Sequence, residues 1–224
     1  MLDSLQDRAA LRSILLGLVA ALVMMVPSVA SVLRINSPGD AALAGALIQD
    51  FDGQPIGYFT SQDFLIGLDG FSVSAVGNDL HIDGTWCDDF GTTGNCLDTV
   101  SSGAEANDDF DVVFTGAGVT AFGFVLNALD NDWTVETYDT DDNLLNTYVV
   151  VSQSPGLTGF DRVGYFGATE ALPIQYFTVR STGNDRALIN DFAYVSVPEP
   201  NRMMLLGLGL LAIGSSRYGR AGSR

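Results

Sequence analysis

Short runs that alternate apolar and polar residues constrain the fold of this chain more than any other feature. In residues 71–75, Phe71, Val73 and Ala75 alternate with two serines. The other runs with β character are 110–115, 119–126, 133–138, 144–151, 173–181 and 187–197, and Gly, Asn or Asp separates most of them. A period of two with turn residues about every ten positions is typical of antiparallel sandwiches. The sequence therefore predicts an all-β, antiparallel and jelly-roll-like β-sandwich.

The region before the first clear run is less regular. Residues 41–48 are rich in Ala and Leu, which favours a helical turn. The stretch 48–53 is interpreted as an entry strand. Because no Ser/Pro/Gly linker divides residues 31–196, they are predicted to form one domain.

The first thirty residues have the pattern of a secretory signal peptide. Arg8 and Arg12 precede an apolar stretch from Ile14 to Val26, and Pro27 and small residues up to Ala30 follow. This order predicts a signal helix that signal peptidase removes after Ala30. The alternative is a retained membrane anchor, but the apolar stretch is shorter than the ~20 residues of a spanning helix.

The predicted domain is strongly acidic. Residues 31–196 contain 24 Asp and Glu against four arginines, a net charge of −20, and the whole chain has no lysine. Such a surface repels nucleic acids and anionic lipids, so neither is an expected partner.

Two cysteines, Cys87 and Cys96, stand in the sequence TWCDDFGTTGNCLD. An exported protein meets an oxidising compartment, so the pair is predicted to form a disulfide that stabilises the fold by about 2–3 kcal/mol. The alternative is a metal site with His81, the only histidine, but zinc needs more ligands of that type.

Catalytic patterns are weak in this sequence. Triad chemistry would need His81 as its base, and no serine lies in a G-x-S-x-G context. Chance pairs of carboxylates are unavoidable among 24 acids. The protein is therefore predicted not to be an enzyme, with glycan hydrolysis as the less favoured alternative, and His81 is predicted to be a partly exposed strand residue.

Calcium binding explains the many acidic residues better than catalysis does, because the ion takes six to eight oxygen ligands. Asp50, Asp52 and Asp191 form one candidate site, because the first and last strands of sandwiches often lie together. The sequence DTDDN places Asp139, Asp141 and Asn143 in D-x-D-x-N spacing, but the interpretation we favour is a hairpin turn.

Sugar binding would use exposed aromatic rings. Trp86 lies beside Cys87 among polar residues and is the candidate for ligand binding. Trp133 begins a predicted strand, so it is expected in the core. Other aromatic residues at inward strand positions are also expected there, namely Phe122, Phe124, Tyr148 and Phe177.

The last 28 residues combine three features in a fixed order. Val197, Pro198, Glu199 and Pro200 form a stiff extended peptide, because each proline restricts the backbone. An apolar run, 203–213, follows; counted as a helix over 203–216 it spans about 21 Å, less than a ~30 Å bilayer core. Arginines, including Arg217 and Arg220, close the chain and would stay in the cytoplasm.

This order resembles the PEP-CTERM sorting signal of Gram-negative bacteria. The resemblance implies an exosortase that cuts near the motif, transient association with the inner membrane, and delivery to the cell surface or extracellular matrix. It also implies an association with exopolysaccharide and biofilm formation. The expected plan is a signal peptide (1–30), a β-sandwich ectodomain (31–196), and a sorting signal with a short transmembrane helix (197–224). The expected function is that of a non-catalytic surface or matrix protein; the alternative is a calcium-dependent carbohydrate-binding module.

Overall fold

The computed structural model describes residues 33–67, 69–89, 93–100, 109–127, 129, 131–151, 164–183 and 186–197. The chain divides into two units, Met1–Ala30 and Ser31–Arg224, and all described residues lie in the second. The predicted signal helix, the predicted transmembrane helix, and Pro198, Glu199, Pro200, Arg217 and Arg220 lie outside the described residues. Within the described ranges, neither helix has the length and apolar character needed to cross a bilayer.

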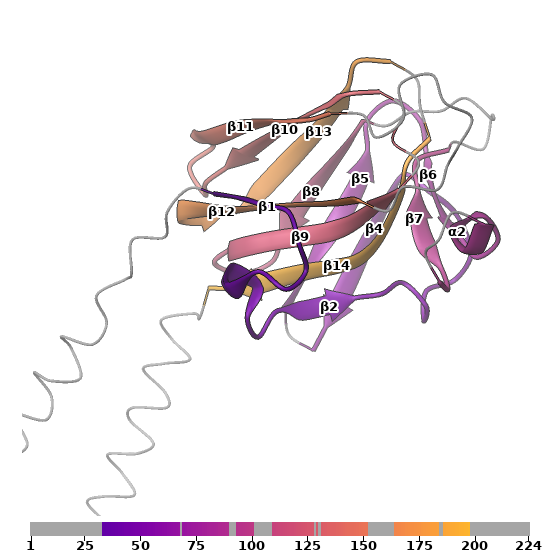
Figure 1. Ribbon diagram of the computed structural model, residues 1–224, viewed down its shortest axis with the longest axis horizontal. Helices are drawn as coiled ribbons and strands as arrows, with labels where there is room; N and C mark the ends of the chain where they lie inside the picture. The colour runs from indigo at the N-terminus through magenta and orange to yellow at the C-terminus, as the bar shows by residue number, and fades with distance from the viewer. Residues whose placement is uncertain are drawn as a thin grey trace, which may run out of the picture. The chain divides into compact units, whose positions relative to one another are not determined.

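The described part of the chain is an antiparallel β-sandwich, as predicted (Figure 1). One sheet has the order β1-β12-β9-β14-β7-β6-β3, with β2 also paired to β14, and the other has the order β11-β10-β13-β8-β5-β4. The strands of the first sheet are β1 (Leu33–Ile35), β2 (Leu47–Gln49), β3 (Gly57–Phe59), β6 (Leu80–Asp83), β7 (Cys96–Asp98), β9 (Val119–Asn127), β12 (Gly164–Ile174) and β14 (Leu188–Ser196). Those of the second are β4 (Ser61–Ile66), β5 (Asp69–Ala75), β8 (Phe110–Phe114), β10 (Trp133–Tyr138), β11 (Leu144–Val150) and β13 (Tyr176–Ser181).

Phenylalanine rings fill the space between the sheets. Phe122 of β9 stacks on Phe177 of β13 with ring centroids 4.3 Å apart, and Phe192 of β14 stacks on Phe71 of β5 at the same separation. These rings are almost fully buried, as is Trp133. Each lies at an inward position of a strand whose alternate residues face outward, so the period of two in the sequence produces this core.

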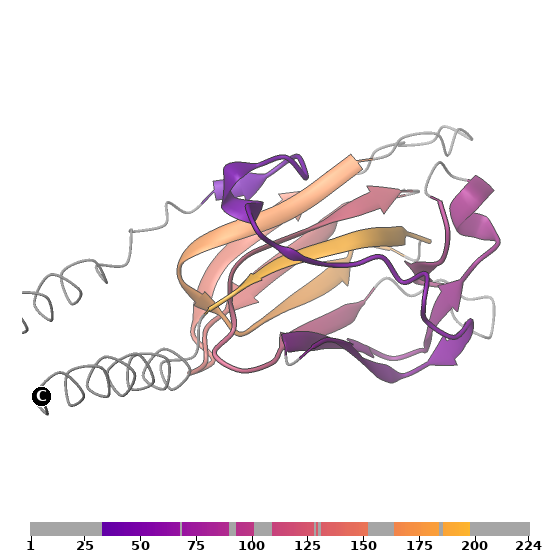
Figure 2. The same cartoon turned by 90° about the horizontal axis from the view of Figure 1, so that it is seen from below.

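The outer side of the first sheet is covered at two places. The 3₁₀ turn η1 (Ala41–Leu43), which Asp40 caps, packs Leu43 in a small cluster with Ile35, Ala121 and Ala193. In Figure 2 the indigo segment that contains η1 and β2 passes in front of β14. Elsewhere the short helix α2 (Trp86–Asp89) brings Cys87 against Cys96 and Leu188.

Candidate functional site

The last strand, β14, has two partners along one edge. β7 pairs with Leu188 and Ile189, and β2 pairs with the stretch from Phe192 to Tyr194. Between these pairings the strand is irregular, and Asp191 has a left-handed backbone (φ 48°). The first and last parts of the domain therefore meet at Asp191, as the sequence predicted for β2 and β14.

Carboxylates gather at this irregularity. The turn after β2 carries Asp50 and Asp52, with Phe51 between them in a left-handed conformation (φ 63°). Partial burial raises the pKa of Asp191, and the negative charges of Asp50 and Asp52 raise it further. Asp191 therefore lies close enough to Asp50 and Asp52 for their charges to disfavour its ionisation. The ligand oxygens of these three residues do not all come within 4.8 Å of one another, so calcium binding here stays a prediction.

One of these three acids already supports the disulfide loop. Asp52 Oδ1 accepts a hydrogen bond from the Asn95 main-chain N–H at 2.9 Å. Gly94 allows this approach, because its φ is +82° and a Cβ atom there would collide with the Asp52 carboxylate. The predicted disulfide between Cys87 and Cys96 is confirmed, with the Cα atoms 6.0 Å apart. The described end of the loop, residues 94–96, is therefore held both by the disulfide and by Asp52.

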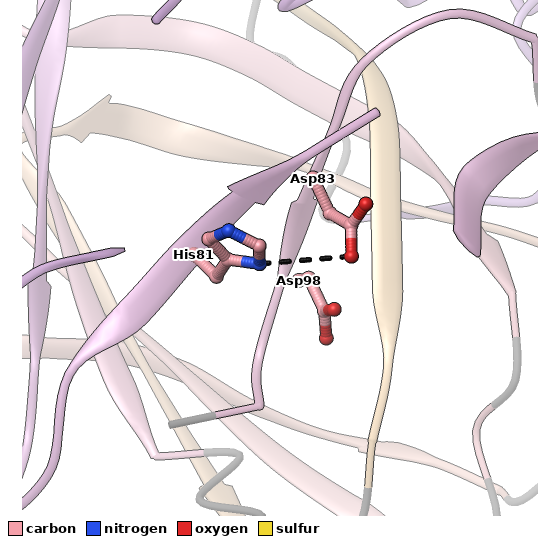
Figure 3. A group of neighbouring side chains, drawn as sticks. All are labelled: His81, Asp83 and Asp98. Carbon is pink, nitrogen blue, oxygen red and sulfur yellow. Dashed lines mark ion pairs between the residues drawn. The ribbon is translucent and has the colours of Figure 1, made fainter. Parts of the chain in front are cut away.

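A second polar cluster lies on the outer side of strands β6 and β7. His81, Asp83 and Asp98 bring one possible metal-ligand atom each within 4.8 Å of one another. Figure 3 shows the His81 Nδ1–Asp83 Oδ2 pair, 3.6 Å apart, with Asp98 beside it. His81 is half-buried in β6, which agrees with the prediction for that residue.

Arg186 occupies much of the ligand capacity of this cluster. Its Nε donates to both oxygens of the fully buried Asp98 at 3.1 Å, and its Nη2 contacts Asp98 Oδ2 and, at 3.5 Å, Asp83 Oδ2. Asp83 Oδ1 accepts the main-chain N–H groups of Thr85 and Trp86. Burial raises the pKa of Asp98, and hydrogen bonds from Arg186 partly oppose this effect. A metal ion would have to displace the guanidinium, so the geometry favours a salt-bridge network.

The network holds the predicted ligand-binding residue, Trp86. The Arg186 Cζ atom lies 4.4 Å from the centroid of the Trp86 ring, and 44% of the residue remains exposed. On β3, Tyr58 stacks on His81 with centroids 4.2 Å apart and 15° between the planes, and 50% of it is exposed. The role of Trp86 in binding stays a prediction.

Sequence reasoning missed Tyr58, Asp83, Asp98 and Arg186. One available signal was the alternation in LHID, which puts His81 and Asp83 on the same face of a strand opposite Leu80 and Ile82. Another was the scarcity of cations: an arginine in so acidic a domain has many carboxylates to pair with.

The hairpin at Asp139 is a turn. Asp139 Oδ1 accepts the main-chain N–H groups of Asp141 and Asn143 at 2.9 Å, and the Asn143 side chain also binds it. These hydrogen bonds lower the pKa of Asp139. The turn interpretation agrees with this geometry, in which the loop uses its own carboxylate as an acceptor.

The predicted sorting motif begins where the sandwich ends. Ser196 is the last residue of β14, and the Val197 main-chain N–H donates to the Gly118 carbonyl at 3.0 Å. The sheet therefore holds the chain up to the first residue of VPEP.

Comparison with known proteins identifies the tail. Residues 196–218 match the family model described as the PEP-CTERM protein-sorting motif, a stretch that includes Val197–Pro200 and Arg217. No curated protein matches the chain.

Several solved structures of carbohydrate-binding proteins are similar to it. One is a family 61 carbohydrate-binding module in complex with β-1,4-galactotriose, with 12% identity, a TM-score of 0.31, and coverage of 56% of this chain and 88% of that chain. A second contains the family 22 binding module and catalytic module of a Clostridium thermocellum xylanase complexed with xylohexaose. Its identity is 12% and its TM-score 0.34, and the match covers 63% of this chain and 29% of that chain. A third is a mutant of a family 29 carbohydrate-binding module, with 9% identity, a TM-score of 0.30, and coverage of 78% of this chain and 95% of that chain.

Proposed function

We propose that this chain, which carries a PEP-CTERM protein-sorting motif, is an exported, non-catalytic protein of the cell surface or extracellular matrix. The carrying observation is the match over residues 196–218, which implies exosortase processing. Signal peptidase would remove residues 1–30. The exosortase would cut near VPEP while the short apolar run holds the chain in the inner membrane, and the acidic sandwich would become part of an exopolysaccharide matrix or biofilm.

The position of the motif supports this order of events. Because β14 ends at Ser196, a cut after Val197 removes none of the strands that the structure describes. The charge of −20 favours solubility of the released domain. Both cysteines are in a disulfide, and the only histidine is stacked on Tyr58 beside a salt-bridge network, an arrangement that supports a non-catalytic role.

The export proposal is tested by expressing the full chain in a bacterium that has an exosortase and in the same strain without it. We expect the wild type on the surface of the first strain, and in the inner membrane of the second as a longer form. Replacing Glu199 with Ala in the motif should reproduce the second result, whereas Asp141→Ala in the exposed hairpin should not. Equal surface delivery in all these cases would refute exosortase sorting.

The alternative proposal is a calcium-dependent carbohydrate-binding module. The raised pKa of Asp191 beside Asp50 and Asp52 favours it, because a divalent cation would relieve the repulsion that these two carboxylates exert on Asp191. Calorimetry of the full chain with CaCl₂ should then show binding that Asp50→Asn abolishes and Asp141→Asn leaves intact. Absence of any calcium heat, or a heat that Asp50→Asn does not change, would contradict this role for the cluster.

A further inference from the structure

Tyr58 is an aromatic residue on the edge strand of the larger sheet. It lies directly opposite His81 in the β3–β6 pairing, and the imidazole covers one side of its ring. Half of the residue is exposed nonetheless. The stacked imidazole limits rotation of the tyrosine, so the ring is held in a defined orientation at the surface.

Trp86 is held in a similar way. A guanidinium lies over its ring, and that guanidinium is itself bound by the buried Asp98. The indole begins α2, whose first turn is fixed by Asp83 and by the disulfide at Cys87. Nearly half of the residue stays exposed although three separate constraints position it.

The two rings belong to one continuous row of contacts. His81, stacked on Tyr58, and Arg186, stacked on Trp86, both approach the same oxygen of Asp83, at 3.6 and 3.5 Å. Tyr58 and Trp86 therefore terminate a row of five neighbouring side chains that hold one another in place. Binding to groups that are already ordered avoids most of the conformational entropy cost of immobilising them.

Charge indicates the class of ligand. Arg186 pairs with Asp98 and Asp83, and His81 lies beside Asp83, so the guanidinium of the row is committed to internal partners. The surrounding domain is strongly negative and repels acidic polymers. What the row offers outward is two fixed aromatic rings, the groups that contribute most at binding surfaces.

We propose that Tyr58 and Trp86 form a binding strip for an uncharged polysaccharide, whose sugar rings pack on the two aromatic side chains. This inference rests on the proposal that the exported domain meets a polysaccharide matrix, and it assigns the surface that does so. Arg186 and His81 are positioning residues that orient the two rings.

The test is affinity electrophoresis of the full chain, solubilised in detergent, in gels containing xylan, galactan or mixed-linkage β-glucan, with alginate as the anionic comparison. We expect at least one neutral polymer to retard the wild type and alginate not to do so. Trp86→Ala and Tyr58→Ala should each weaken that binding about tenfold or more. Tyr138→Ala is the matched control, because Tyr138 also stacks on a neighbouring ring, Tyr176, but on the other sheet.

Near-UV circular dichroism of each variant checks that the phenylalanine core is intact. The variant Trp86→Phe keeps an aromatic ring and should therefore retain part of the affinity for the polymer. Failure of every neutral polymer to bind, binding of alginate alone, or equal loss in the Tyr138 variant would overturn the proposal. Processing is scored separately by the length of the surface form. A protein that is processed but does not bind refutes only the strip, and one that binds but is not processed refutes only the sorting.

Discussion

Asp191 combines an unusual backbone conformation with an unfavourable electrostatic environment. It adopts a left-handed backbone that Asn tolerates as well as Asp does, and its pKa is raised by partial burial and by Asp50 and Asp52. A raised pKa in the folded state means that the stability contributed by the protonated carboxyl is present at low pH. This stability is lost as pH rises through the folded-state pKa.

We therefore expect Asp191→Asn to raise the melting temperature at pH 7 in the presence of a calcium chelator. The gain should shrink as the pH falls and vanish below about pH 4, where an ordinary Asp is protonated. Thermal unfolding across this range measures it, with Asp141→Asn in the exposed hairpin as a control of little effect. A variant that melts at or below the wild-type temperature at pH 7 would show that Asp191 is not under this repulsion.

Arg186 has a different role, because its partner Asp98 is fully buried. Arg186→Gln leaves that carboxylate without its cation and should lower the free energy of unfolding by about 3 kcal/mol at pH 7. Since burial already raises the pKa of Asp98, the loss should diminish as the pH falls and this group is protonated.

The matched control is Arg180→Gln, which breaks the ion pair between Arg180 and Asp111. More than a third of the Arg180 side chain is exposed. Such a pair contributes about 1 kcal/mol or less. Urea denaturation gives the free energy of unfolding of both variants. Equal losses of stability would mean that the buried network stabilises the fold no more than the exposed pair does.

At the scale of elements, the disulfide loop depends on one glycine. Gly94 has a left-handed backbone, and a methyl group there would meet the Asp52 carboxylate that accepts the Asn95 N–H. Gly94→Ala should cost about 1–3 kcal/mol of stability. Gly53→Ala is the control, since a Cβ atom there meets nothing within 4 Å, and should change stability by less than about 0.5 kcal/mol. Denaturant unfolding with the disulfide intact gives both values, and a neutral Gly94→Ala would mean that Asp52 does not anchor this loop.

The strands with clear alternation could be predicted from sequence, and those without it could not. The run 133–138 is strand β10 to the residue, because Trp133, Val135 and Thr137 face inward in strict alternation. The run 173–181 was expected as one strand, but β12 ends at Ile174 and β13 begins at Tyr176. Both Ile174 and Phe177 are buried, three positions apart, so the chain changes sheets where the period breaks. Strands of three residues such as β3 and β7 contain too few positions to show a period.

The site was predictable only where its parts are local. The disulfide and the Asp139 turn lie within ten residues of chain, and the sequence indicated both. Arg186 and Asp83 are 103 positions apart and meet only because β6, β7 and β14 are neighbours. No local pattern contains that information, so the network around Trp86 required the structure.

At the scale of the whole molecule, the chain combines a folded domain with terminal segments whose proposed role is delivery. The sandwich has its own core, and Val197, the first residue of VPEP, still donates its main-chain N–H to the Gly118 carbonyl. The stretch matched by the sorting model begins one residue earlier, at 196. The central claim is that residues beyond this point serve delivery and are then removed.

Intact-mass spectrometry of the protein collected from the surface of an exosortase-containing bacterium tests this claim most directly. The account predicts a single chain that begins near Ser31, ends near Val197 and carries one disulfide. A surface protein with the mass of all 224 residues would contradict it.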